Sequence, residues 1–287
     1  MSVAHHALAF ACGSEWLAGV VTRPAHPLRR GVLIAVGGPQ YRVGSHRQFT
    51  LLANHLAQQG MAAMRFDYRG AGDSTGELAT FEHVEPDLRA AADAFFEAVP
   101  ELREIVIWGL CDAASAALFY AHKDARVTGL VLLNPWIRST GSEARAYLKH
   151  YYWHRLWSAE PWRKLLRGEL DLRGSAQSLA GNVRHAMVNG ESRGACAPHP
   201  AADPKPLAAR MAEGLSSFRG RVLLILSGND LTAQEFMDVS GASRQWRRLL
   251  AAPRVSRRML PEATHTFSSR AWRDRAASWT AEWMRSW

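Results

Sequence analysis

Cysteine is scarce in this chain of 287 residues, which has three: Cys12, Cys111 and Cys196. An odd and widely spaced set does not form a disulfide framework, and no Cys-x-x-Cys spacing supplies a pair of metal ligands. The sequence therefore predicts no metal site and no bound cofactor. Any role for a cysteine must come from its individual setting.

Long apolar runs are lacking as well. VTGLVLLNPW, one of the longest, is far too short to cross a bilayer. The first residues, MSVAHHALAFACG, contain no Lys or Arg before their short apolar stretch, which is atypical of a signal peptide. We therefore expect a cytoplasmic chain with no stable membrane insertion.

Acidic residues are outnumbered by basic ones, 26 Asp and Glu against 35 Lys and Arg, which gives a net charge of +9. Such a balance can indicate an anionic partner. The arginines are spread along the chain, however, and no run is typical of a nucleic-acid-binding tail. We interpret the excess as a basic surface and predict no nucleic-acid partner; the sequence leaves the oligomeric state open.

Apolar runs typical of strands alternate with helical patterns along most of the chain. The expected strands cover residues 31–36, 61–70, 105–108, 126–136, 221–230 and 254–260, and expected helices cover 46–59, 84–99 and 112–122. This alternation predicts an α/β fold with a mostly parallel central sheet flanked by helices. A segment rich in Trp, Tyr, Arg and His interrupts the rhythm. We assign residues 1–136 and 219–287 to the core and residues 137–218 to a helical cap inserted between two strands.

The stretch IVIWGLCDAASAALFY places a thiol at a sharp corner between a strand and a helix. Small residues, Gly109 and Ala113, stand two positions before and after Cys111, which is the pattern of a nucleophile elbow. A thiol at a helix N-terminus is expected to be more acidic than a free one. The N–H of Asp112 is expected to face a developing oxyanion. A buried cysteine that merely fills space is the alternative.

Two further residues follow strand ends in the order expected of an α/β-hydrolase triad. Asp230 lies at the end of RVLLILSGND, and His265 lies in LPEATHTF, just after the last expected strand. The chain order is nucleophile, acid, base. We therefore predict a catalytic triad of Cys111, Asp230 and His265.

A second serine motif competes with this assignment. Residues 72–76, GDSTG, match Gly-x-Ser-x-Gly by letter, but no good helix begins directly after them. Ser74 is therefore a weak alternative nucleophile, and Ser115, one helical turn after Cys111, is expected to be buried.

The loop after residues 31–36 is expected to supply the second oxyanion donor. Pro39 has no N–H, which leaves Gly38 and Gln40 as candidates. We assign Arg42, His46, Arg47 and Trp136 to substrate binding. The three basic residues could hold a carboxylate or phosphate, or could equally be surface charges at the start of the next helix.

The motifs GGPQYRVGSHRQF, FDYRGAGDSTG, WGLCDAASAALFYA, SGND and ATHTF resemble the hydrolase 1 family associated with the exosortase A system. That resemblance covers nearly the whole chain. It implies the α/β-hydrolase fold, a Cys in place of the usual Ser, and a genomic setting of exopolysaccharide synthesis and protein sorting. It implies no substrate.

These observations together predict an acyl hydrolase of the esterase or thioesterase type, which acts on a small-molecule or carrier-linked acyl substrate through an acyl-cysteine intermediate. Transfer of the acyl group to an alcohol or sugar is the nearest alternative. A non-catalytic binding or scaffold protein on the same fold, and a redox thiol, are the others.

Overall fold

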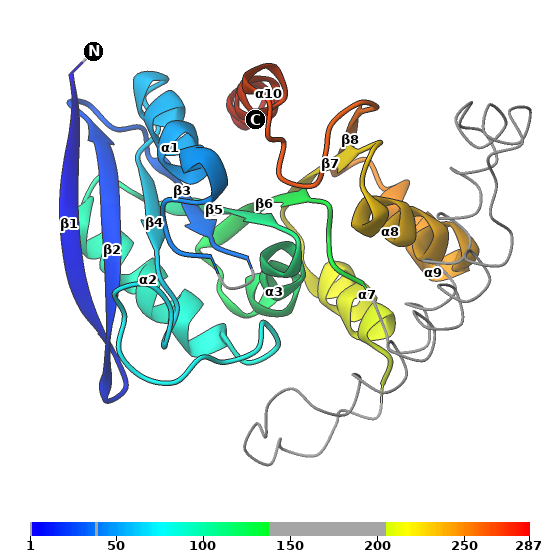
Figure 1. The fold of residues 1–287 in the computed structure, drawn as a ribbon, viewed down its shortest axis with the longest axis horizontal. Helices are drawn as coiled ribbons and strands as arrows, with labels where there is room; N and C mark the ends of the chain where they lie inside the picture. Colours follow the sequence, from blue (N-terminus) through cyan, green and yellow to red (C-terminus); the bar gives the residue numbers. More distant parts are fainter. Residues whose placement is uncertain (1, 38–39, 138–204) are drawn as a thin grey trace, which may run out of the picture. The chain divides into compact units, whose positions relative to one another are not determined.

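The computed structural model describes residues 2–37, 40–137 and 205–287, and in these ranges an eight-stranded sheet organises the chain (Figure 1). Its strand order is β1-β2-β4-β3-β5-β6-β7-β8. All strands from β3 to β8 run parallel to one another. The strands are β1 (Val3–Cys12), β2 (Glu15–Pro24), β3 (Arg30–Ala35), β4 (Ala63–Phe66), β5 (Glu104–Leu110), β6 (Val127–Leu133), β7 (Arg221–Ser227) and β8 (Val255–Leu260). The predicted fold class is confirmed.

The central strands are buried on both faces, which is why their sequences are apolar without alternation. Every residue of β4 is buried, and in β3, β5 and β7 only the first residue is not. A short apolar run of this kind indicates a strand between two helical layers. The sequence therefore located these strands to within a few residues.

The antiparallel hairpin of β1 and β2 was not predicted. Ten residue pairs join the two strands, from Val3 opposite Pro24 to Cys12 opposite Glu15. β1 is an edge strand rich in Ala and His and exposed along much of its length, so its apolar alternation is limited to Leu8, Phe10 and Cys12. The first 13 residues were assessed only for the features of a signal peptide.

Helices cover both faces of the sheet (Figure 1). One face carries α1 and α10, and the other carries α2 and α3, with α7 packed against α3. Their bounds are α1 (Gln48–Gln58), α2 (Glu85–Ala98), α3 (Asp112–Tyr120), α7 (Leu207–Ser217), α8 (Leu231–Ala242), α9 (Arg244–Leu250) and α10 (Arg270–Arg285), with 3-10 turns η1 (Ser45–Arg47) and η2 (Ala121–Lys123). None of the helices in the described ranges is long and apolar enough to cross a membrane.

The helix expected from residue 46 begins at Gln48 instead. His46 and Arg47 have φ values of 52° and 58°, outside the range of a right-handed helix. A 3-10 turn over Ser45–Arg47 therefore precedes α1. This turn joins the helix to the loop that carries Gln40.

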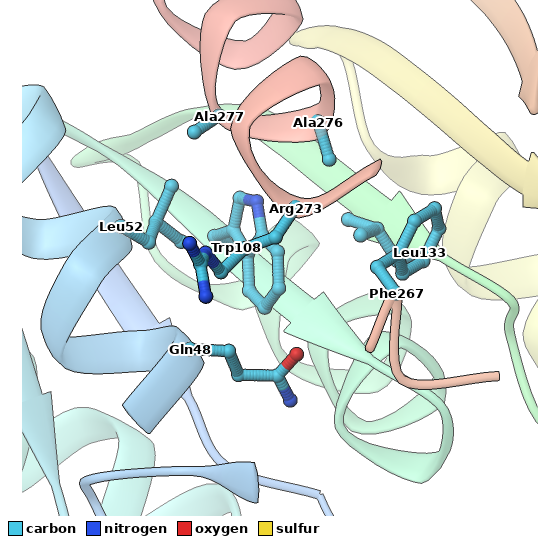
Figure 2. Close-up of a pocket in the computed structure, with 8 residues that line it drawn as sticks. All are labelled: Gln48, Leu52, Trp108, Leu133, Phe267, Arg273, Ala276 and Ala277. Atoms are coloured by element: carbon cyan, nitrogen blue, oxygen red, sulfur yellow. The ribbon is translucent and has the colours of Figure 1, made fainter. Parts of the chain in front are cut away.

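The core is closely packed where α1 and α10 meet above β5 and β6. A cavity of only about 20 Å³ lies there, which is room for about one water molecule. Figure 2 shows the Trp108 ring of β5 among its lining residues, which are Gln48, Leu52, Trp108, Leu133, Phe267, Arg273, Ala276 and Ala277. The face of the sheet under α1 and α10 is thus filled by side chains.

Most of the predicted cap, residues 138–204, lies outside the described residues, as does Cys196. The end of that predicted insertion is described, and there α7 packs closely on α3. A Cβ atom added to Gly214 would lie 2.2 Å from the carbonyl oxygen of Leu118. The cap and its boundaries stay a prediction.

Candidate active site

The strand, turn and helix predicted around Cys111 are present. β5 ends at Leu110, α3 begins at Asp112, and Cys111 between them has φ 63° and ψ −125°. Such a backbone is strained for a residue with a side chain and is typical of functional turns. A Cβ atom on Gly109 would lie 2.7 Å from both the carbonyl carbon and oxygen of Ala113, so the turn tolerates no larger residue there.

His265 and Asp230 lie beside this turn and contact one another. Asp230 is the N-cap of α8, where its carboxylate accepts from the N–H groups of Thr232 and Ala233 at 3.2 Å each. The same carboxylate accepts from Nδ1 of His265 at 2.9 Å. The Asp230 side chain is 6% exposed and that of His265 is 35% exposed. The carboxylate is therefore fixed by the helix, and it orients the imidazole.

The pKa of His265 is raised from its ordinary value of 6.5 to about 10. The main cause is the hydrogen bond to Asp230, followed by a hydrogen bond to Cys111, and these outweigh the opposing effect of burial. Because Nδ1 is engaged by Asp230, the other ring nitrogen is the one left for the thiol. The structure thus brings His265 against Asp230 and places His265 and Cys111 in the wall of one cavity.

A cavity of about 430 Å³ opens beside Cys111 and His265. Its walls are largely apolar and aromatic; the described lining residues are Gly37, Gln40, Phe49, Phe81, Leu110, Cys111, Asp112, Trp136 and His265. Trp136, assigned to substrate binding, lies in this wall, and its N–H donates to the Cys111 carbonyl at 3.2 Å. Phe49 and Phe81 were missed, because neither a helix start nor a loop phenylalanine carries a distinguishing signal.

Of the three expected oxyanion donors, the structure describes Asp112 and Gln40. Asp112 is the first residue of α3, and its Oδ1 accepts from the N–H of Ala113 at 2.9 Å. Gln40 lines the cavity, and its Oε1 accepts from the N–H of Ser45 at 3.3 Å. Gly38 lies outside the described residues. A Cβ atom on Gly37 would come within 2.5 Å of Asp112 Oδ1, so this loop and the helix start are in close contact.

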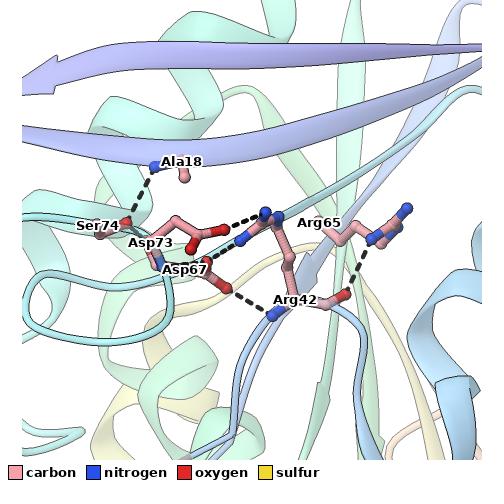
Figure 3. Close-up of polar contacts among 6 residues, drawn as sticks. All are labelled: Ala18, Arg42, Arg65, Asp67, Asp73 and Ser74. Atoms are coloured by element: carbon pink, nitrogen blue, oxygen red, sulfur yellow. Dashed lines mark hydrogen bonds and ion pairs between the residues drawn. The ribbon is translucent and has the colours of Figure 1, made fainter.

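Arg42, assigned to substrate binding, contacts two carboxylates of the loop after β4 (Figure 3). Its guanidinium pairs with the fully buried Asp67 and, at 2.5 Å, with Asp73. Its backbone N–H also donates to Asp67 Oδ1 at 2.5 Å. Two carboxylates therefore satisfy Arg42, which ties the Gln40 loop to the loop after β4. His46 and Arg47 are exposed and are not among the described residues that line the cavity.

The alternative serines have structural contacts. Ser74 Oγ donates to the Asp67 carbonyl at 2.8 Å and accepts from the N–H of Ala18 at 3.0 Å (Figure 3). Ser115 is buried, as expected, and donates to the Trp136 carbonyl at 2.6 Å. Neither serine is among the described residues that line the cavity beside His265.

The buried Cys12 is poorly placed as a redox partner for Cys111. Cys12 is the last residue of β1 and Cys111 follows β5, and these strands are four steps apart in the strand order. At about 4.8 Å for each step, roughly 19 Å separates the strands. No group of metal-ligating side chains occurs within the described ranges.

A mostly parallel sheet, a nucleophile turn after β5, an acid after β7 and a histidine after β8 define the class of α/β-hydrolases. The comparison with protein families agrees with this class. The chain belongs to the family described as serine aminopeptidase, S33 (Hydrolase_4), whose model matches residues 30–267. The protein is therefore a hydrolase of the α/β fold.

Solved structures show the same fold at low sequence identity. The esterase Pf2001 of Pyrococcus furiosus is 15% identical with a TM-score of 0.66, and the match covers 99% of this chain and 91% of that one. A dienelactone hydrolase of Anabaena variabilis is 16% identical with a TM-score of 0.62, over 100% of this chain and 99% of the other.

A similarity to a curated protein is confined to part of the chain. The polyketide transferase grgF of a Penicillium species is 30% identical over 102 residues, which is 33% of each chain. The match thus spans only a third of that relative's length.

Proposed function

We propose that this protein is a cytoplasmic acyl hydrolase that cleaves ester or thioester bonds with Cys111 as its nucleophile. The observation that carries the proposal is the placement of Cys111 and His265 in the wall of one largely apolar cavity, with Asp230 bonded to His265 Nδ1. Cys111 stands at the N-terminus of α3, where N–H groups and the helix dipole favour negative charge.

In the acylation step, Cys111 Sγ attacks the acyl carbonyl carbon, and His265 accepts the thiol proton. With its pKa raised to about 10, the imidazole is protonated at neutral pH and can donate that proton to the leaving oxygen or sulfur. Asp230 holds the ring through Nδ1. The N–H of Asp112, with that of Gly38 or Gln40, stabilises the oxyanion.

In the deacylation step, His265 takes a proton from water, which attacks the acyl-cysteine. A thioester at Cys111 carries no negative charge, so its contribution to the raised pKa of His265 disappears. The lower pKa leaves more of the imidazole neutral, and so able to accept a proton, at the stage that needs it. The acid product leaves, and the proton returns to the Cys111–His265 pair.

Cysteine departs from the serine that the family description names. A thiolate attacks esters and thioesters readily, and an acyl-cysteine is itself a reactive thioester. This chemistry favours activated esters and thioesters over amides. The resemblance to the exosortase A-associated family adds an exopolysaccharide-related setting to the proposal and no substrate.

Acyl transfer is the second candidate, and the partial similarity to a polyketide transferase supports it. The same acyl-cysteine would then be attacked by an alcohol in place of water. The aromatic wall of Phe49, Phe81 and Trp136 suits an apolar acyl group in either case.

Hydrolysis of p-nitrophenyl acetate and of short acyl thioesters by the purified protein and its variants tests the proposal. Cys111→Ala is expected to abolish turnover, and Cys12→Ala, which removes a buried free thiol on the edge strand β1, four strands away from β5, is the matched control. Intact mass measurement should find an acyl adduct in wild type and none in Cys111→Ala. Added alcohols distinguish transfer from hydrolysis by the product formed.

Unchanged turnover in Cys111→Ala would contradict the assignment, and Ser74→Ala would then be measured. An inert thiol together with no turnover of any ester would favour the scaffold alternative. Activity retained by Cys111→Ser would show that the site also works with the family's serine.

A further inference from the structure

The amide side chain of Asn134 is buried completely at the end of β6. Its backbone has φ 43°, a left-handed conformation that Asn tolerates better than most residues. A buried amide is costly unless each polar atom is bonded. The contacts of Asn134 therefore show what the residue holds in place.

Asn134 bonds to the neighbouring strand and to the loop of His265. Its Oδ1 accepts from the N–H of Ser227 at 2.9 Å, and its Nδ2 donates to Ser227 Oγ at 2.8 Å. The same Nδ2 donates to the main-chain carbonyl of His265 at 3.1 Å. Ser227 Oγ in turn donates to the carbonyl of Thr264 at 3.1 Å. Two successive carbonyls of the histidine loop are thus held by two fully buried side chains.

The residue before Asn134 holds the nucleophile turn. The N–H of Cys111 donates to the Leu133 carbonyl at 2.9 Å, and the N–H of Asn134 donates to the Ile225 carbonyl of β7 at 3.2 Å. The Leu133 carbonyl thus holds the backbone of Cys111, and the side chain of the next residue, Asn134, holds the backbone of His265. This arrangement fixes both loops to one point of the sheet.

We propose that Asn134 and Ser227 are positioning residues that set the placement of His265 against Cys111. The inference rests on the proposed function for its catalytic consequence. Neither side chain touches the substrate cavity among the described lining residues. They act through the main chain of the loop that carries the base.

Stability alone does not explain this pair. Buried polar side chains seldom stabilise a core more than apolar ones of the same shape, but they do fix one arrangement. Their donors are aimed at the carbonyls of Thr264 and His265, which are groups of a loop outside the strand ladder. A small displacement of the imidazole would change its distance from the reacting atoms, and therefore the reaction rate.

The experiment compares Asn134→Asp and Ser227→Ala with wild type, and Thr280→Val is the matched control. Asn134→Asp keeps the shape and the acceptor but removes the donor to the His265 carbonyl. Thr280 is also fully buried, and its hydroxyl donates within α10 to the Ala276 carbonyl at 2.8 Å, away from the site. Three readouts are taken: kcat and KM for p-nitrophenyl acetate, the rate of Cys111 alkylation by iodoacetamide, and the imidazole titration of His265 by NMR.

We expect Ser227→Ala and Asn134→Asp to lower kcat by about tenfold or more while KM changes little. Alkylation of Cys111 should slow, and the titration of His265 should move down from about 10 toward 6.5. Thr280→Val should lower the melting temperature only. If Asn134→Asp does not fold, Ser227→Ala decides the outcome.

Wild-type kcat, alkylation and histidine titration in folded Ser227→Ala would overturn the inference. If wild type hydrolyses no ester, the proposed function fails separately, because the histidine titration still reports whether Asn134 and Ser227 hold the loop. An unmoved titration together with active wild type would contradict the positioning role alone.

Discussion

The protonation of His265 controls the charge of the site. Its pKa is raised to about 10, chiefly through the hydrogen bond to Asp230. A histidine whose folded pKa exceeds its unfolded value of 6.5 stabilises the fold fully below that value, and this contribution is lost as the pH rises through about 10. The 35% exposure of the side chain keeps the effect modest.

His265→Gln should therefore lower the free energy of unfolding most between pH 5 and about pH 6.5. The difference from wild type should shrink toward pH 10 and above. Urea unfolding across this range measures it. In an Asp230→Asn background the same substitution should show a weaker pH dependence; an equal dependence there would mean that Asp230 is not the cause.

Asp67 is a second residue whose removal should be costly. It is fully buried and accepts from the N–H groups of Arg42 and Asp73 and from the Arg42 guanidinium. Asp67→Asn places an amide donor among these donors and should lower the free energy of unfolding by about 2 kcal/mol. Urea unfolding checks this.

Asp73→Asn is the control for that experiment, because Asp73 pairs with the same Arg42 but its side chain is 70% exposed. An exposed pair contributes below about 1 kcal/mol. Equal losses for the two variants would contradict the buried role of Asp67. The ion pairs of Arg42 with Asp67 and Asp73 also show why two roles stayed open for Arg42 in the sequence: nothing in the chain indicates which carboxylates an arginine will contact.

At the scale of elements, the turn between β5 and α3 is the most constrained feature of the site. A Cβ atom on Gly109 would overlap the Ala113 carbonyl. Gly109→Ala should displace the start of α3, lower the free energy of unfolding by about 1–3 kcal/mol, and reduce Cys111 reactivity.

Gly241→Ala is the control for Gly109→Ala. Gly241 lies in α8 with nothing within 4 Å of an added Cβ atom. Alanine there should raise stability by up to about 1 kcal/mol without changing the rate of alkylation. Thermal unfolding and iodoacetamide labelling measure both effects. A stable and fully reactive Gly109→Ala would mean that the turn does not constrain Cys111.

The elements around the site were predictable because each left a local signal. Continuous apolar runs marked the buried strands, and Gly109, Cys111 and Ala113 marked the turn. The hairpin of β1 and β2 was missed, since β1 is an edge strand exposed along much of its length and the buried alternation of β2, at Leu17, Gly19 and Val21, was overlooked. Phe81 and Asn134 were equally invisible, because their roles come from contacts between segments distant in the chain.

At the scale of the whole molecule, the two ends of the parallel strands have different tasks. Cys111, Asp230, His265 and the cavity lie at the carboxyl ends, as expected for the site of an open α/β sheet. The last residue lies toward the amino ends. The Arg30 guanidinium, at the start of β3, lies 3.6 Å from the centre of the Trp287 ring and donates to the Trp287 carbonyl at 2.8 Å.

Trp287 also packs edge-on against Trp283 of α10, with ring centres 5.4 Å apart. The end of the chain is thus held to the first strand of the parallel sheet by packing and by a cation–π contact. Trp287→Ala should lower the free energy of unfolding by about 2–3 kcal/mol, less than for a fully buried Trp. Because the change is at the opposite end of the strands, kcat should stay at the wild-type value.

Urea unfolding and esterase assays on one preparation test both parts of this prediction, and Trp16→Ala is the control. Trp16 is 57% exposed on β2, so its loss should change stability by less than about 0.5 kcal/mol. A Trp287→Ala protein that is as stable as Trp16→Ala would mean that the chain end contributes nothing to the fold. A stability loss accompanied by a fall in kcat would mean that the amino and carboxyl ends of the strands are coupled, which the rigid, doubly covered sheet argues against.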